Sequence, residues 1–291
     1  MRRIAGLVLA LLGAFLVTAA IVALILAPGV KKTPLDVDST TYVTGNGGKL
    51  DTATGELRDE PVAAKSVTKS DSEASSDETV VFASYSCVVY GTGPEVPCIE
   101  NPDDQRTITI SQDVFATDRV TALAVPTELE SVPHEGLINK WPFDAEQKTY
   151  PYWDGVTQQA VDAVFDRTET IRGLETYVYT VNIDDAPIEI AEGVPGTYTD
   201  AKEIAVDPVT GSIIRQTESQ QRFLENGDPA LDLDIAFTEE QVAKNVRDAA
   251  DSGSSLGLIS STVPLFGFLL GVPLLLGGLF LLRSGSRRRE S

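Results

Sequence analysis

The sequence predicts a mainly β extracytoplasmic domain with few short helices, bracketed by two transmembrane α-helices. Two uncharged apolar runs near the ends of the 291-residue chain predict the helices, and stretches rich in β-branched and aromatic residues between them predict the strands. The expected order is a short N-terminal segment (1–3), a first span (4–28), the β-rich domain (29–255), a second span with its outer entry (256–282) and a basic tail (283–291).

The first apolar run is long enough to cross a bilayer. Its 24 residues from Ile4 to Ala27 would extend over roughly 36 Å as a helix, against a hydrocarbon core of about 30 Å. The alternative is a cleaved signal peptide, whose apolar region is about 7 to 15 residues long. Because the run is longer and Pro28 follows the best cleavage position, we expect an uncleaved anchor.

Arginines flank the two runs on the chain-terminal side. Arg2 and Arg3 precede the first run, and four arginines follow the second, namely Arg283, Arg287, Arg288 and Arg289. Positive charge marks the cytoplasmic side of a span. The pattern predicts that both termini are cytoplasmic and the central domain lies outside, although Lys31 and Lys32 weaken the bias at the first span.

Small residues form a stripe along both spans. They recur every four residues in the first run and form a Gly-x-x-x-Gly step in the second: Gly6, Ala10, Ala14 and Thr18, then Gly267 and Gly271. Such stripes let helix backbones approach closely in lipid. We expect the spans to pack on each other, or to pair between chains in a homo-oligomer.

Strand signals recur through the central domain. Thr79–Tyr90 and Thr107–Ser111 are rich in β-branched residues. Residues 168–181 predict two strands hinged at Arg172-Gly173, and residues 204–215 predict another pair hinged between Asp207 and Gly211. Residues 50–58 repeat the Asp-x-x-Thr-Gly turn pattern. The polar run over 66–78 predicts a mobile loop.

Helix signals are few in this domain. The apolar spacing in residues 158–165 predicts a helical turn or two. Thr238-Glu-Glu-Gln241 has the pattern of a capping box, in which the threonine caps the first amides and the glutamine reaches back. A helix over about 239–251 should follow and end near Gly253.

The two cysteines predict one structural disulfide. Cys87 and Cys98 lie in the segment expected outside the cell, where disulfides persist. Glycines and prolines between them predict a chain reversal, so the bond should tie the two arms of a hairpin. Closing so short a loop contributes on the order of 3 kcal/mol.

The central domain is strongly acidic. The six terminal arginines and Glu290 leave 17 of the 23 basic and 42 of the 43 acidic side chains between the spans. This balance opposes nucleic-acid binding, which depends on neutralising phosphates. The charge either keeps the domain soluble or attracts cations or a basic partner.

No catalytic or cofactor motif occurs in the sequence, so we expect no enzyme and no cofactor. The acidic pairs Asp184-Asp185 and Asp232-x-Asp234 could ligate Ca²⁺, but the second pair alternates with leucines as a strand would. His134 lies in a turn-like context. We therefore predict no metal site.

Aromatic residues cluster between residues 141 and 153. The cluster comprises Trp141, Phe143, Tyr150, Tyr152 and Trp153. Flat rings with polar edges can stack on sugars or apolar chains. The alternative is that the rings form a small core beneath an irregular, proline-containing loop.

Several segments together resemble a known family. The resemblance rests on Asp118–Thr121, Lys140–Phe143, Thr149–Asp154, Gly173–Tyr177 and Val206–Gly211, placed between two terminal spans. It covers nearly the whole chain, and the family is the actinobacterial PorA family of cell-envelope proteins. The family's name implies a channel-forming cell-wall protein.

Two functions remain open from the sequence. The first is a channel or channel subunit in the membrane, as the resemblance implies, with selectivity for cations. Polar side chains are scarce in the spans: the first contains Thr18, and the second has Ser260, Ser261 and Thr262 at its outer edge. Neither span therefore has the pattern of a pore lining. The second is a membrane-tethered binding or scaffold module for an envelope lipid, glycolipid or protein.

Overall fold

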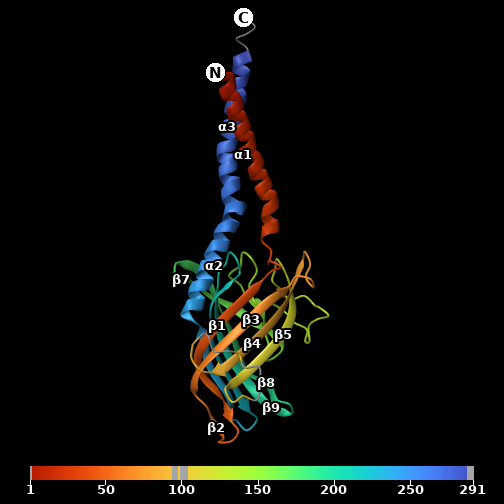
Figure 1. Ribbon diagram of the computed structural model, residues 1–291, viewed down its shortest axis with the longest axis vertical. Coiled ribbons are helices and arrows are strands. Elements are labelled where there is room, and N and C mark those ends of the chain that lie inside the picture. Colours follow the sequence, from red (N-terminus) through yellow and green to blue (C-terminus); the bar gives the residue numbers. More distant parts are fainter. Residues whose placement is uncertain (1, 94–97, 99–103, 287–291) are drawn as a thin grey trace. The chain divides into compact units, whose positions relative to one another are not determined.

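The computed structural model describes residues 2–93, 98 and 104–286. They form two compact units: a helical unit, up to Lys32 and from Asp251 onward, and a β unit, Thr33–Ala250 (Figure 1). Met1, Arg287, Arg288 and Arg289 lie outside the described residues, so part of the predicted basic tail does too. The mainly β fold with a long helix near each end is confirmed.

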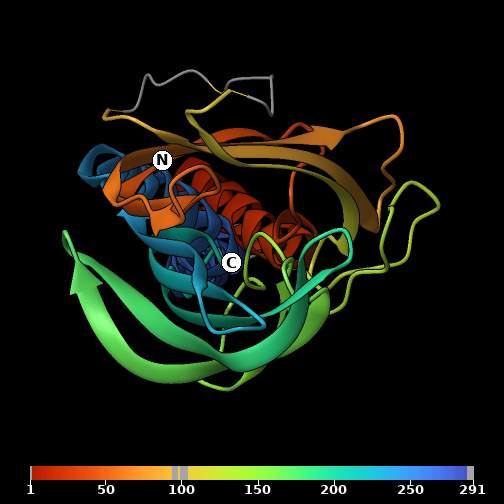
Figure 2. The same ribbon diagram turned by 90° about the horizontal axis from the view of Figure 1, so that it is seen from below.

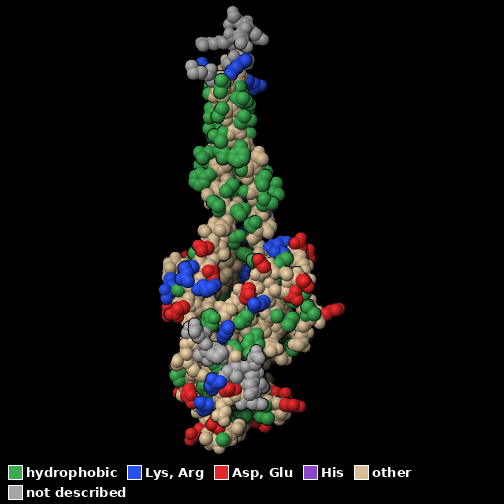
Figure 3. Space-filling model, in the orientation of Figure 1, with side chains coloured by type: hydrophobic (Ala, Val, Ile, Leu, Met, Phe, Trp, Pro, Cys, Tyr) green, Lys and Arg blue, Asp and Glu red, His purple; other side chains and the backbone are tan. Residues whose placement is uncertain are grey.

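The helical unit pairs two long apolar helices. Helix α1 spans Arg2–Val30 and α3 spans Val263–Ser286; by length and composition, both are able to cross a membrane. Hydrophobic side chains cover the visible face of this unit, while charged ones are spread over the β unit (Figure 3). A π-helical turn, Leu258–Thr262, precedes α3.

Glycines bring α1 and α3 into close antiparallel contact. A Cβ atom added to Gly13 would lie 2.3 Å from the Leu275 amide nitrogen, and one added to Gly278 would lie 2.4 Å from the Ala10 nitrogen. Gly6, Gly267 and Gly271 also face the partner helix at close range. The helices therefore pack backbone to backbone, as small residues allow.

Gly6 and Ala10 of the stripe predicted on α1 lie in the contact. Ala10 and Ala14 are both half-buried, and Thr18 is exposed. The buried small residues of α1 are Gly6, Gly13, Ala20 and Ala23, and the first three are spaced seven apart. Because a helix turns by about 100° per residue, four-residue steps drift around it, whereas seven-residue steps stay on one face.

The β unit is built from eleven antiparallel strands. They are β1 (Asp38–Asp51), β2 (Glu56–Leu57), β3 (Glu60–Asp71), β4 (Thr79–Tyr90), β5 (Thr107–Asp118), β6 (Tyr150–Asp154), β7 (Gln159–Ile171), β8 (Leu174–Ala191), β9 (Val194–Val206), β10 (Ile213–Leu224) and β11 (Pro229–Phe237). Their order is β5-β4-β3-β1-β11-β10-β9-β8-β7-β6, and β2 pairs with β1. The hairpins predicted at Arg172-Gly173 and at 207–211 are both present.

The sheet curls so that its edge strands β5 and β6 approach the same connecting segment (Figure 2). The Val125 amide donates to Ala116 of β5, and the Ala124 amide donates to Gly136. Leu137 in turn donates to Pro151 of β6 and accepts from Trp153. Backbone hydrogen bonds therefore continue from one edge to the other, which gives the β unit a barrel-like wall.

Helix α2 (Glu239–Gly257) begins as the capping pattern predicts. The Gln241 amide donates to Thr238 Oγ1 at 3.1 Å, but Gln241 Oε1 accepts from the Tyr42 amide of β1 instead of reaching back to the cap. Up to Ala250, α2 packs through Val242 and Ala249 on the outer side of the sheet. It does not end near Gly253, because that glycine keeps a negative φ.

Two local predictions are wrong. Ser66–Asp71, expected in a mobile loop, belong to strand β3, and the loop is confined to the turn after Asp71. Residues 159–165, expected to be helical, belong to strand β7. In both cases pairing with two neighbouring strands overrides the local pattern.

One turn type recurs four times in the β unit. In each copy an aspartate oxygen accepts from the amides two and three residues onward, starting at Asp51, Asp118, Asp154 and Asp207. The fifth residue has positive φ in every copy. At Gly211 two constraints require glycine. Its φ of +74 is one that other residues rarely adopt, and an added Cβ would lie 2.0 Å from the Trp141 carbonyl oxygen.

The Cys87–Cys98 disulfide is confirmed, with the Cα atoms 5.7 Å apart. It does not tie two paired arms, however. Cys87 belongs to β4, whereas Cys98 lies in the connection between β4 and β5. The bond therefore fixes that connection to the wall, and it leaves no free cysteine among the described residues.

Candidate functional site

The inner face of the curled sheet is the face on which the connecting segment packs. Ala122, Leu137 and Trp141 of that segment form one core cluster with Tyr179 of β8 and Tyr198 of β9. Helix α2 covers the opposite, outer face. Side chains alternate between the faces of a strand, so the register assigns every other residue to one of them.

The predicted aromatic cluster lies in the core. Trp141 is fully buried, and its ring centroid lies 5.1 Å from that of Tyr179 and 5.7 Å from that of Tyr152. Tyr150 and Trp153 are also buried, and the half-buried Phe143 ring lies beneath the Lys140 ammonium. Trp141 contacts Tyr152 and Tyr179, Tyr150 contacts Tyr179, and Trp153 contacts His134, so these four buried rings offer no open stacking face.

Hydroxyl groups line part of the inner face. Two adjacent cross-strand rows run over β1, β3, β4 and β5: Ser39, Thr68, Ser84 and Asp113, then Thr41, Ser66, Ser86 and Ser111. We call these seven hydroxyl residues together with the Asp113 carboxylate the hydroxyl belt. Ser39 and Ser111 are exposed and the other six are half-buried. Protein cores rarely present so many hydroxyls inward. The belt is therefore a polar strip of the inner face, between the apolar clusters around Phe82 and around Tyr90.

One end of the belt is held by a buried histidine. His134 Nε2 lies 2.9 Å from Asp113 Oδ2, and Nδ1 lies 3.1 Å from Glu130 Oε2. The His134 ring is also 4.7 Å from that of Trp153. His134 therefore links the edge strand β5 to the connecting segment and to β6.

Charged side chains gather elsewhere on the inner face. The inner charge cluster consists of Lys202 and the carboxylates Asp154, Asp200 and Glu218, with Arg222 nearby. Lys202 Nζ lies 3.4 Å from Asp154 Oδ2 and 3.6 Å from Glu218 Oε1, and it donates a short hydrogen bond to Asp200 Oδ2. Three strands, β6, β9 and β10, supply these groups. The Lys202 side chain is only 9% exposed and that of Asp200 is fully buried.

Burial and neighbouring charges shift the pKa values of the cluster's side chains. Burial raises the pKa of Asp200 to about 6, although the Lys202 charge opposes this. Burial alone would lower the pKa of Lys202, but the carboxylates of Glu218 and Asp200 outweigh it and raise that pKa well above its usual value. Burial also lowers the pKa of Arg222.

Two buried polar atoms of the cluster lack a hydrogen-bond partner among the described residues. They are Asp200 Oδ1 and Arg222 Nε. The guanidinium of Arg222 does donate to Gln220 and lies 5.9 Å from the Tyr198 ring. Buried polar groups are normally paired, so the Asp200 oxygen is an unused acceptor inside the cluster.

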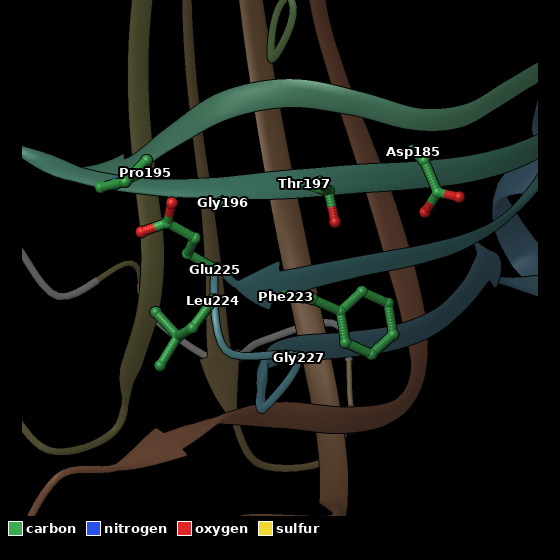
Figure 4. Close-up of a pocket in the computed structure, with 8 residues that line it drawn as sticks. All are labelled: Asp185, Pro195, Gly196, Thr197, Phe223, Leu224, Glu225 and Gly227. Atoms are coloured by element: carbon green, nitrogen blue, oxygen red, sulfur yellow. The ribbon is translucent and has the colours of Figure 1, made fainter.

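A surface pocket of about 470 Å³ lies at the ends of the β8–β9 and β10–β11 hairpins (Figure 4). Thr197 and Phe223, which line it, are sequence neighbours of Tyr198 and Arg222 and therefore face outward. The pocket is thus separate from the inner charge cluster. Its remaining lining residues are Asp185, Pro195, Gly196, Leu224, Glu225 and Gly227.

The sequence analysis missed the inner charge cluster. It considered Asp184-Asp185, which lie at an irregular, exposed point of β8, and Asp232 and Asp234, which face away from Leu231 and Leu233 on β11. The alternation of residues along a strand could have revealed the cluster. Asp200 and Lys202 lie on the same face of β9 as the apolar Tyr198 and Ile204, so two charged side chains point toward the core. Among the described residues, no group of three or more His, Cys, Asp or Glu side chains is arranged to hold a metal ion.

Comparison with known proteins identifies the family. The model of the family described as Porin PorA matches residues 5–280, which include most of both long helices and the whole β unit. The chain belongs to the Porin PorA family. A relative from Corynebacterium amycolatum named Porin PorA is 23% identical over 313 aligned residues, covering 92% of this chain and 78% of the relative.

Membership in the Porin PorA family fits the two candidate spans and assigns the protein to the membrane. It also confirms the family resemblance found in the sequence. Within this Porin PorA protein, the hydroxyl belt and the inner charge cluster are the polar features that require a functional account.

Proposed function

We propose that this protein forms a channel in the cell envelope, with the inner face of the β unit as the polar wall of the conduit. The observation that carries this proposal is the hydroxyl belt, a polar strip on the inner face of the sheet. The name of the relative, Porin PorA, supports the same function. No catalytic role is proposed.

The paired helices serve as anchors in this proposal. Their mutual face is filled by backbone contacts at Gly13, Gly271 and Gly278, which leave no room for water between α1 and α3. Their other faces present large apolar side chains. A conduit in the membrane would therefore require several copies of the chain around it.

The wall of the β unit is suited to water on its outer side. Arg215 donates to both carboxylate oxygens of Glu169 at 2.8 and 2.9 Å, and Arg167 joins Glu169 to Glu203 on the same outer face. A transmembrane barrel would present apolar side chains there instead. We place the β unit outside the cell, where its acidity favours cations over anions.

Planar bilayers test this function with an introduced thiol. Ser84→Cys places a thiol in the hydroxyl belt, and Ala83→Cys, the adjacent exposed residue, places one on the outer face. Because the native cysteines are bonded to each other, a bulky methanethiosulfonate should react with the introduced thiol alone. We expect it to lower the current through Ser84→Cys at least about twofold and to leave Ala83→Cys unchanged.

Equal behaviour of the two variants would show that the inner face is not the conduit. If folded protein gave no more current than a denatured control, the channel function would be wrong. The alternative, a tethered module that binds an envelope lipid or protein, would then be preferred. It ranks second because four of the five aromatic rings that would serve it are buried.

A further inference from the structure

Two cations, Arg119 and Lys140, meet at Thr33, the first residue of the β unit. Thr33 is buried, and its amide donates to the Arg119 carbonyl oxygen at 2.8 Å. Arg119 Nε donates to the Thr33 carbonyl oxygen at 2.7 Å, and the Lys140 ammonium donates to Thr33 Oγ1 at 3.4 Å. Both positive charges therefore lie beside one residue. We call Thr33, Arg119 and Lys140 together the Thr33 site.

Carboxylates compensate these two charges only weakly. Lys140 forms no ion pair within the described part of the chain, and its other neighbour is the Phe143 ring, whose centroid lies 3.8 Å from Nζ. Arg119 reaches Asp77 at 3.9 Å, but the Asp77 side chain is 99% exposed, and such a surface pair contributes little. Burial lowers the pKa of Lys140 to about 8. An anion beside Lys140 would favour its charged form.

The Thr33 site also has hydrogen-bond donors to spare. An ammonium group has three donors and a guanidinium has five. Lys140 uses one donor in its long bond to Thr33, and Arg119 directs Nη1 at the carbonyl oxygens of Ser76 and Asp77 at 3.4 and 3.3 Å. Phosphate oxygens are acceptors that both arginine and lysine bind well. The unused donors therefore suit a phosphate group.

The position of Thr33 in the chain indicates the source of such a phosphate. Helix α1 has 29 residues and ends at Val30. It is therefore roughly 44 Å long, about the thickness of a bilayer with its headgroups. Three residue steps from Val30 to Thr33 cover at most about 11 Å. If α1 crosses the membrane, as its length and composition allow, the Thr33 site lies within reach of the lipid headgroups.

We propose that the Thr33 site binds the phosphate of an anionic phospholipid, with Lys140 and Arg119 as the cations that hold it. An anionic lipid is favoured over phosphatidylcholine, because the choline group would bring a further positive charge to the two already there. The acidic remainder of the β unit repels an anionic surface, so the contact is confined to this site. The inference requires the protein to be in the membrane and does not depend on conduction.

Thermal unfolding of the full-length protein tests the site. The protein is compared in detergent micelles that contain phosphatidylglycerol or phosphatidylcholine with the same acyl chains. Phosphatidylglycerol should raise the Tm of the wild type by at least about 3 °C over phosphatidylcholine, and Lys140→Gln should lose at least about half of that shift. Lys148→Gln removes an exposed lysine of the same connecting segment, paired with Glu146, and should respond as the wild type does.

Two further variants of Lys140 keep the test decisive. Lys140→Met removes the charge but keeps an apolar side chain, so it covers the case in which Lys140→Gln does not fold. Lys140→Arg keeps the charge and should keep the lipid response. The site would be overturned if the wild type showed no response, or if a folded Lys140→Gln or Lys140→Met responded as fully as the wild type. An equal shift from inorganic phosphate in phosphatidylcholine micelles would also overturn it, because a free anion would then replace the lipid.

Discussion

Asp200 is the residue whose protonation should affect stability most clearly. Burial holds its pKa at about 6 in the folded protein, against roughly 3.9 for an unfolded aspartate. A raised folded pKa gives stability that is fully present below the unfolded pKa and is lost as pH rises through the folded pKa. The contribution of Asp200 to the free energy of unfolding should therefore fall by roughly 1–2 kcal/mol between about pH 5 and pH 7.5.

Asp200→Asn should remove this pH dependence. We expect thermal unfolding in detergent to show a Tm decrease of about 3–6 °C from about pH 5 to pH 7.5 that is larger in the wild type than in the variant. Asp162→Asn changes an exposed aspartate on the outer face of β7 and serves as the control. If Asp200→Asn and Asp162→Asn keep the same pH profile as the wild type, Asp200 does not titrate in this range.

The sequence predicts single residues well where one local rule decides them. Gly211 has the positive φ that the Asp-x-x-Thr-Gly turn requires, and Thr238 caps α2 through one short-range bond. Asp200 lies two residues from Lys202 on the same strand, but the partners Asp154 and Glu218 were beyond prediction, because they lie 48 and 16 residues away on other strands. Their contact exists only through the strand register, which a single sequence does not specify.

Elements were predictable where the hydrophobic pattern was strong. Both long helices and strand β4 lie where the apolar and β-branched runs are. Strand β3 was missed because its inner residues Ser66, Thr68 and Ser70 are polar, so the apolar half of the usual alternation is absent there. Strands whose inner face is polar lack the apolar alternation by which a sequence indicates a strand, so they are hard to predict.

The contact between α1 and α3 gives a prediction at the scale of elements. Gly13→Leu must push the helices apart, because even a Cβ atom at Gly13 would lie 2.3 Å from the Leu275 nitrogen. Gly277→Leu meets no heavy atom within 4 Å of its Cβ position. Both substitutions raise intrinsic helix propensity by about 0.8–1 kcal/mol, so their difference isolates helix packing.

We expect Gly13→Leu to destabilise the detergent-solubilised protein by roughly 1–3 kcal/mol relative to Gly277→Leu. Thermal unfolding in one detergent, with both variants at equal concentration, measures the difference. Indistinguishable Tm values would mean that the glycine contact does not stabilise the protein and that the two helices act as independent anchors.

At the scale of the whole molecule, the distribution of charge bears on orientation. Of the 23 basic side chains, six are arginines at the chain ends, while 42 of the 43 acidic ones lie between the two long apolar runs. Positive charge beside a span is retained in the cytoplasm, whereas acidic residues have little influence on which segments are translocated. Two spans would also return the chain to its starting side, which would place both ends in one compartment.

We therefore predict that both termini are cytoplasmic and that residues 33–250 are outside. Ser286→Cys and Ala83→Cys each introduce one free thiol, since the native cysteines form a disulfide. A membrane-impermeant maleimide on intact cells should label Ala83→Cys, whose position is exposed on the outer face of β4. It should label Ser286→Cys only after the cells are permeabilised, because the tail would lie behind the membrane. Labelling of Ser286→Cys on intact cells would reverse the orientation, and it would place the acidic β unit on the cytoplasmic side, where it could not line a conduit open to the exterior.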